Sequence, residues 1–132
     1  MMGEKQQEKI WTRGEVVAAF RKMWDPFPHI VLLLTKDRTI QAANAKVLEM
    51  GVRVGSKCFQ LTGSKEVHEV CLANAALQEN QAKRNVGPYA ERFLDTYWLP
   101  IAGEKDLYIH FSIDITKWAD PALMKGNVAS GR

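Results

Sequence analysis

The chain has 132 residues, of which 46% are hydrophobic and 25% are charged. This length and composition suit one folded domain with a single core and exclude a disordered protein. Eighteen Lys and Arg side chains against 15 Asp and Glu give a net charge of +3. The basic residues are scattered and form no stripe with interleaved aromatic residues, so we expect no nucleic-acid partner.

The hydropathy pattern indicates in which cellular compartment the protein is expected. No apolar segment reaches the roughly 18 residues that a membrane-spanning helix needs, and the longest, residues 30–34, has the length of a strand. The first residues are polar and lack the apolar stretch of a signal peptide. We therefore expect a cytoplasmic protein without a membrane partner, in which Cys58 and Cys71 are reduced.

The first predicted element is a short amphipathic helix that follows Thr12. Thr12 and Glu15 have the spacing of a capping box, in which each side chain bonds the backbone N–H of the other residue. Pro26 and Pro28 end the helix because neither can donate a helical hydrogen bond. Apolar side chains at helical spacing predict one buried face, formed by Val16, Phe20, Met23 and Trp24.

Two strands and a short helix are predicted next. Residues 29–35 form a continuous apolar run, which is typical of a strand buried on both faces. Residues 36–38 form a turn, and residues 39–42 form a weaker neighbouring strand. Asn44 is placed to cap a short helix that Gly51 closes.

The middle of the chain is less regular. Ser64 is placed to cap a second helix, from about Lys65 to Gln78. Residues 83–86 then form a weak strand, which we expect Gly87 and Pro88 to end. Residues 92–99 form a stronger strand, and residues 103–106 form the hairpin loop that leads to the last strand.

The last strand has the clearest pattern in the chain. Strict alternation over residues 107–116 separates an apolar face from a more polar one. The apolar face consists of Leu107, Ile109, Phe111, Ile113 and Ile115. Taking this face as the one that meets the core helices places His110, which points the other way, on the outer surface of the sheet.

The order of these elements is a helix, two strands, short helices and three strands. It predicts an α+β fold, with a five-stranded antiparallel sheet, short helices on one face and an N-terminal amphipathic helix. Four stretches, in this order and spacing, resemble the PAS family. They are Asn44 at the start of a helix, the Gly-x-x-Cys-aromatic stretch at residues 55–59, the end of the fourth strand at residues 97–101, and Asp-Ile-Thr at residues 114–116.

The resemblance implies a domain organisation and a function. Residues 28–117 would form the PAS core, after a tail and helix at residues 1–27 and before a C-terminal tail at residues 118–132. It implies a central first strand, covered on its outer face by the helix at residues 12–24. It also implies a sensory module that binds a small ligand or cofactor and relays the signal through a homodimer or an unidentified signalling partner. The alternative is a ligand-free module for protein–protein interaction or dimerisation.

The ligand that the resemblance implies would be small and apolar or aromatic, held between the helices and the sheet. The sequence identifies no cofactor. Aromatic and apolar residues such as these usually fill a core, and they line a cavity only where that space is open. The candidate lining residues are Phe59, Phe93, Tyr97, Ile109 and Phe111.

A third hypothesis is a redox or metal sensor built on Cys58, His68 and Cys71. His68 and Cys71 are three residues apart and would share a helix face. Some PAS sequences similar to this one carry Cys at all three positions, and the set here could bind Zn²⁺ or an iron centre with a further ligand. The simpler interpretation is that both cysteines are small buried hydrophobic residues.

Other cofactors and catalysis fit the sequence less well. The flavin-adduct motif of LOV domains would need Asn and Arg where Lys57 and Phe59 stand, and Gln where Ser112 stands. No Cys-x-x-Cys-His motif attaches a haem covalently, although haem binding through His68 remains an alternative. The carboxylates sit at predicted helix starts and turns, and no Gly-rich phosphate loop is present, so we expect no enzyme.

Overall fold

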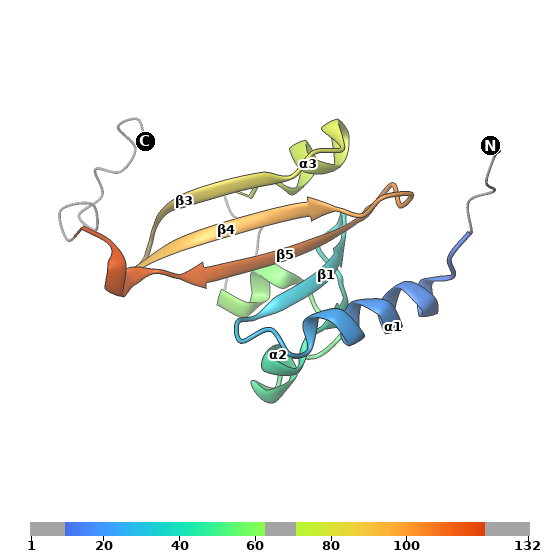
Figure 1. Ribbon diagram of the computed structural model, residues 1–132, viewed down its shortest axis with the longest axis horizontal. Coiled ribbons are helices and arrows are strands. Elements are labelled where there is room, and N and C mark those ends of the chain that lie inside the picture. The colour runs from blue at the N-terminus through green and yellow to red at the C-terminus, as the bar shows by residue number, and fades with distance from the viewer. Residues whose placement is uncertain (1–9, 63–70, 121–132) are drawn as a thin grey trace, which may run out of the picture.

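The computed structural model of the chain describes residues 10–62 and 71–120, which form an antiparallel sheet with helices on both sides (Figure 1). The five strands have the spatial order β2-β1-β5-β4-β3. They are β1 (Val31–Thr35), β2 (Ile40–Ala43), β3 (Lys83–Tyr89), β4 (Arg92–Pro100) and β5 (Leu107–Asp114). The helical elements are α1 (Arg13–Trp24), α2 (Ala45–Glu49), α3 (Ala73–Glu79) and two 3-10 turns, η1 (Cys58–Thr62) and η2 (Thr116–Trp118).

Two of the three predicted helix starts, at Thr12 and Asn44, are confirmed. The Thr12 hydroxyl accepts from the Glu15 backbone N–H at 3.1 Å, and the Glu15 carboxylate accepts from the Thr12 N–H at 3.0 Å, which completes the capping box of α1. Asn44 caps α2 by accepting from the Val47 N–H. Within the described residues, no helix is both long and apolar enough to cross a membrane.

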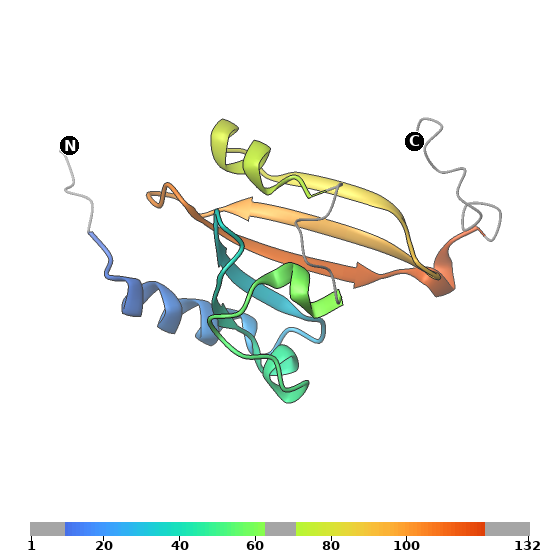
Figure 2. The same cartoon turned by 180° about the vertical axis from the view of Figure 1, so that it is seen from behind.

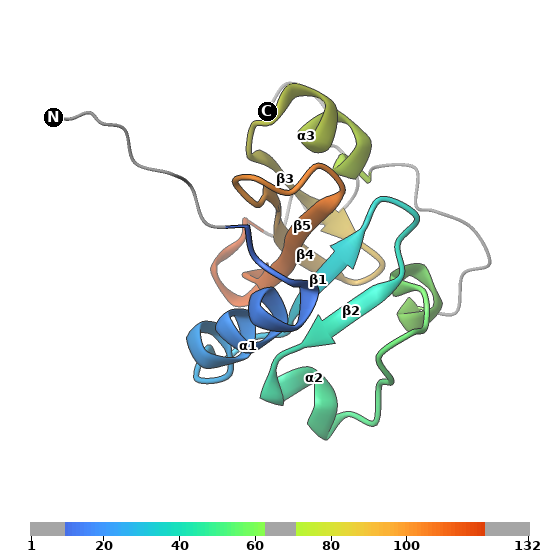
Figure 3. The ribbon, with the colours of Figure 1, turned by 90° about the vertical axis from the view of Figure 1, so that its right-hand side faces the viewer.

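Strand β1 lies inside the sheet and is buried on both faces, as the apolar run predicts. Val31 and Leu33 pack in one hydrophobic cluster, together with Val16 and Phe20 of α1. We call this side of the sheet the α1 face. α1 therefore covers β1 on this face, as expected (Figure 3).

Leu32 and Leu34 point to the opposite side, which we call the helical face. They pack in a second cluster with side chains from α2, α3, β4 and β5, namely Val47, Ala73, Ala76, Trp98 and Tyr108. Figures 1 and 2 show the two sides in turn, with α1 in front of β1 in the first and η1 in front of it in the second.

The predicted orientation of β5 is wrong. Leu107, Ile109 and Phe111 pack on the α1 face, whereas Tyr108 lies in the core of the helical face. His110 lies on that same face, with its ring stacked on Trp98 at a centroid distance of 5.2 Å. The alternation was identified correctly, but the more apolar side of the strand faces one long helix and the more polar side faces several short ones.

Two predicted boundaries also differ from the structure. β3 continues through Gly87 and Pro88, because it is an edge strand and a proline there leaves no ladder hydrogen bond unmade. α3 begins at Ala73, and Leu72 before it is not helical, so no unbroken helix extends to Gln78 from residue 65. Ser64 and the predicted start of that helix lie outside the described residues.

Candidate functional site

The turn between β1 and β2 brings Arg38 into the protein interior. Its backbone has a φ of 72°, a left-handed conformation that is uncommon for a residue with a side chain. The Arg38 N–H donates to the Thr35 carbonyl at 2.8 Å, and the Arg38 carbonyl accepts from the Cys58 N–H at 2.9 Å. These bonds hold the turn in this conformation and tie it to η1.

The Arg38 side chain is buried, with 5% of the residue exposed. Nη1 donates to the Lys36 carbonyl and to Asn74 Oδ1, the latter at 2.9 Å, and Nη2 donates to Cys71 Sγ at 3.3 Å. Arg38 therefore joins the β1–β2 turn to α3 and to the residues before it. These hydrogen bonds go to a carbonyl, an amide and a cysteine sulfur, and none goes to a carboxylate.

Three buried side-chain atoms of the described residues have no hydrogen-bond partner: Arg38 Nε, Trp98 Nε1 and Tyr108 Oη. Trp98 and Tyr108 are 3% and 0% exposed, and both belong to the cluster on the helical face. Burial raises the pKa of Tyr108 well above its ordinary value, and the nearby Arg38 charge opposes this shift. The Tyr108 hydroxyl therefore lies near the Arg38 guanidinium, in a buried environment.

Cys58 and Cys71 flank this group and pack against the same cluster. Burial raises the pKa of the Cys58 thiol to about 11; the neighbouring Cys71 adds to the shift, and Arg38 opposes it. Cys58 is therefore protonated at neutral pH, which makes it a poor nucleophile. We define the polar cluster as Arg38, Cys58, Cys71, Asn74 and Tyr108.

The predicted lining residues do not gather around one space. Tyr97, Ile109 and Phe111 lie on the α1 face, where the Tyr97 and Phe111 rings stack at 5.0 Å. Phe59 belongs to η1, and the η1 residue Cys58 packs on the opposite side of the sheet. Phe93 is buried at the start of β4, where its backbone bonds Ile115 and Thr116. Whether any of these residues binds a ligand stays a prediction.

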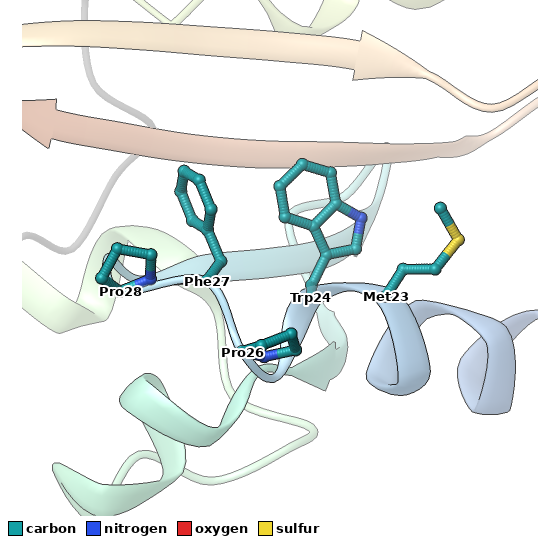
Figure 4. Close-up of a pocket in the computed structure, with 5 residues that line it drawn as sticks. All are labelled: Met23, Trp24, Pro26, Phe27 and Pro28. Atoms are coloured by element: carbon teal, nitrogen blue, oxygen red, sulfur yellow. The ribbon is translucent and has the colours of Figure 1, made fainter.

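An aromatic group instead surrounds the end of α1. Trp24, Phe27 and Phe111 contact one another with ring centroids 5.3 to 5.7 Å apart. The end of α1 and the segment after it line an open, apolar hollow of about 370 Å³. Figure 4 shows Trp24 and Phe27 pointing from this region towards the sheet; the other lining residues are Met23, Pro26 and Pro28.

Neither a family model nor a curated protein matches the sequence. Solved structures do. The PAS domain of BvgS from Bordetella pertussis is similar to this chain with a TM-score of 0.64 at 20% identity, over 83% of this chain and 92% of that domain. A sensory box sensor histidine kinase structure from Vibrio cholerae has a TM-score of 0.56 at 13% identity, over 83% of this chain and 100% of that one.

A domain of an HTR-like protein from Haloarcula marismortui is also similar, with a TM-score of 0.54 at 21% identity, over 67% of this chain and 99% of that domain. The open five-stranded antiparallel sheet with a few helices is consistent with this likeness. The chain has the PAS fold. The five-stranded antiparallel α+β architecture predicted from the sequence is therefore confirmed.

Within this PAS fold, the structure places two of the three predicted metal ligands. Cys58 and Cys71 lie in the polar cluster, and His68 lies outside the described residues. Among residues 10–62 and 71–120, no three His, Cys, Asp or Glu side chains gather as they would around a metal ion. Whether His68 completes a set stays a prediction.

Sequence reasoning missed the centre of the polar cluster. Arg38 stands in a Lys-Asp-Arg turn, a pattern that is typical of an exposed loop. Tyr108 and His110 were assigned to the outer surface because the alternation of β5 was matched to the wrong side of the sheet. The available signal was Tyr108 itself, a large amphipathic residue opposite Leu34, in a strand next to the most apolar strand of the chain.

Proposed function

We propose that this chain is a sensory PAS module that binds a small molecule on the helical face and relays binding to the α1 face. The observation that carries the proposal is the group of buried atoms without partners, Arg38 Nε, Trp98 Nε1 and Tyr108 Oη. Buried polar groups are nearly always hydrogen-bonded, and leaving one unmade costs about 1–3 kcal/mol. A bound molecule would supply the missing partners.

The relay would run through β1. Leu32 and Leu34 contact the helical-face cluster, and Val31 and Leu33 contact the α1 cluster, so one five-residue strand belongs to both. A closely packed strand transmits a shift from one face to the other, because neither side has space to absorb it. The output would be a change at α1 that a second copy or a signalling partner reads.

A second candidate is a ligand-free module for dimerisation or partner binding. The apolar hollow after α1 favours it, together with three large side chains of the α1 region that are strongly exposed: Ile10, Trp11 and Met23. Apolar surface of this kind is typical of interaction sites. In this case we expect a homodimer that purifies without a bound molecule.

The third candidate is a redox or metal sensor at Cys58 and Cys71. The proximity of the two thiols in the polar cluster favours it, and the raised pKa of Cys58 counts against it. That same protonated thiol leads us to propose a binding role and not a catalytic one, because an activated cysteine needs a lowered pKa.

The first test is native mass spectrometry of the freshly purified chain, followed by the same measurement after denaturation. We expect a bound small molecule that is released on denaturation. In the Tyr108→Phe and Arg38→Gln variants, we expect lower occupancy. The matched control is Arg84→Gln, which removes an arginine from the α1 side of the sheet, where it pairs with Asp95 at 2.7 Å.

The outcomes separate the three candidates. A homodimer without added mass, even when the cells are lysed gently, would contradict the ligand-sensing proposal and support the interaction module. An added mass that matches a metal ion and is lost in Cys58→Ser would support the third candidate. A molecule retained equally by all the variants would place binding away from the polar cluster.

A further inference from the structure

The atoms without partners on the helical face have one chemical property in common. Arg Nε–H and Trp Nε1–H can only donate a hydrogen bond, and the Tyr108 hydroxyl donates readily. The two oxygen acceptors that bond Arg38 among the described residues, the Lys36 carbonyl and Asn74 Oδ1, both bond Nη1. The helical face therefore has an excess of donors, and the missing group must be an acceptor.

The electrostatics point in the same direction. Arg38 is 5% exposed, and its guanidinium has no carboxylate within ion-pairing distance among the described residues. Asp37, which precedes Arg38 in the sequence, accepts from Thr35 and Thr39 and pairs with Lys57 at 3.2 Å. A buried charge without a counter-ion is strongly unfavourable. An anion beside Arg38 would relieve that cost.

The geometry of the guanidinium narrows the class of anion. Nη1 is held by the Lys36 carbonyl and Asn74, whereas the edge formed by Nε and Nη2 makes one hydrogen bond to the described residues, from Nη2 to Cys71 Sγ at 3.3 Å. This edge presents two parallel N–H groups. Such a fork matches the two oxygens of a carboxylate.

The surroundings of the polar cluster are apolar. Leu34, Ala73, Ala76 and Trp98 are all at most 3% exposed and belong to the same cluster as Tyr108. A hydrated inorganic anion would lose its water shell there without compensation, whereas an organic body would be buried favourably.

We infer that the ligand of this PAS domain is a small organic carboxylate, with its carboxylate held by the Nε–Nη2 edge of Arg38 and the Tyr108 hydroxyl and its apolar body on Trp98 and α3. The inference rests on the proposed function, since it names the ligand class of the same site. Arg38 would pair with the negative charge of the carboxylate, and the Tyr108 hydroxyl would donate a third hydrogen bond to it. Trp98 Nε1 is available to donate to a further acceptor on the ligand.

The experiment is a ¹⁵N-NMR titration of the whole chain, in which the Arg38 Nε–H and Trp98 Nε1–H signals are followed directly. The probes are sodium acetate, butyrate and benzoate, each paired with its neutral amide of nearly the same shape. We expect at least one acid to shift both signals in a saturable way at up to about 10 mM, where a ligand with a Kd of about 1 mM is mostly bound. We expect its amide to bind at least about tenfold more weakly.

Two variants test the assigned roles. Arg38→Lys keeps the charge but removes the fork, and we expect it to weaken binding of the acid by about tenfold or more. Tyr108→Phe removes one hydroxyl without changing the shape of the ring, and we expect a weakening of about threefold to tenfold. Because Arg38→Lys could also perturb the turn, thermal unfolding of each variant is measured alongside. Arg84→Lys, on the α1 side, is the matched control and should bind as the natural chain does.

Each remaining outcome overturns the inference. If an amide binds as tightly as its acid, the site does not distinguish a charged carboxylate from a neutral group. If no probe moves either signal, water molecules satisfy the donors and no carboxylate site exists. The proposed function fails separately, by the native mass measurement. If native mass spectrometry finds a bound neutral molecule and the NMR signals do not respond to carboxylates, the proposal of a sensory module is supported and the inference of a carboxylate ligand is refuted.

Discussion

Asn44 makes more connections than any single sequence signal suggested. Its Oδ1 accepts from Val31 N–H at 3.1 Å and from the N–H of the α2 residue Val47 at 3.3 Å. Its Nδ2 donates to the carbonyls of Trp24 and His29 at 3.0 and 2.9 Å, and a longer contact reaches the Phe27 carbonyl. One fully buried amide thus fixes the end of α1, the start of β1 and the start of α2.

We therefore predict that Asn44→Ala lowers the free energy of unfolding by about 3 kcal/mol, because it leaves several buried backbone groups without partners. Asn44→Asp should cost at least as much, since a carboxylate would face carbonyl oxygens that need a donor. Urea unfolding followed by tryptophan fluorescence measures both. The matched control is Asn85→Ala on β3, whose side chain has no hydrogen bond to the described residues, and we expect a change below about 0.5 kcal/mol. Equal losses at the two positions would contradict this role for Asn44.

At the scale of elements, the β1–β2 turn is organised by Asp37. Its carboxylate accepts from the Thr35 hydroxyl at 2.7 Å and from the Thr39 N–H at 3.0 Å, and it pairs with Lys57 at 3.2 Å. Hydrogen bonds from Thr35 and Thr39, followed by the interaction with Lys57, lower the pKa of Asp37 far below its ordinary value of 3.8. The turn that positions Arg38 is thus stabilised by an ionised side chain.

This gives the sign of a pH effect. A carboxyl group with a lower pKa in the folded chain stabilises the fold above its unfolded pKa, and this contribution is lost as the pH falls. We predict that the free energy of unfolding decreases from about pH 5 to about pH 2, and that Asp37→Asn flattens this decrease. Chemical unfolding at a series of pH values measures the slope. Asp106→Asn, an exposed loop carboxylate 4.0 Å from Arg13, is the control and should keep the slope of the natural chain. An unchanged slope in Asp37→Asn would refute the prediction.

The elements show which kinds of structure the sequence could predict. The α1 capping box, the Asn44 cap and the doubly buried β1 were predicted correctly, because each depends on neighbours within a few residues. The face of β5 was not, because alternation separates two faces without saying which tertiary layer each one meets. Leu107, Ile109 and Phe111 pack on the face that α1 covers. The sequence does not show whether an apolar strand face packs against α1 or against the shorter helices on the other side of the sheet.

The candidate site was harder to predict for the same reason. Arg38 and Asn74 are 36 residues apart and meet through the packing of a turn against α3. Cys58 and Cys71 were identified from residue type and from the resemblance to PAS sequences, and the structure does place them together. Tyr108 could be assigned to the candidate site only when the orientation of β5 was known. A site assembled from four separate elements leaves no local spacing for a motif to capture.

At the scale of the whole molecule, a relay requires the two faces of the sheet to be energetically coupled. The two hydrophobic clusters are separate, and β1 supplies side chains to both. Phe20 on α1 and Val47 on α2 belong to different clusters and are 4% and 1% exposed. If β1 couples the faces, loosening one cluster must change the cost of loosening the other.

A double-mutant cycle measures this coupling. We expect Phe20→Leu and Val47→Ala each to cost about 1–3 kcal/mol, and the double variant to depart from their sum by at least about 0.5 kcal/mol. The control cycle pairs Phe20→Leu with Phe93→Leu, since Phe93 is buried at the far end of β4 and belongs to neither cluster as described. It should be additive, because distant and independent sites are. Additivity in both cycles would mean that the clusters respond independently, and a signal from the polar cluster would then have to leave through α3 and the neighbouring strands and not through α1.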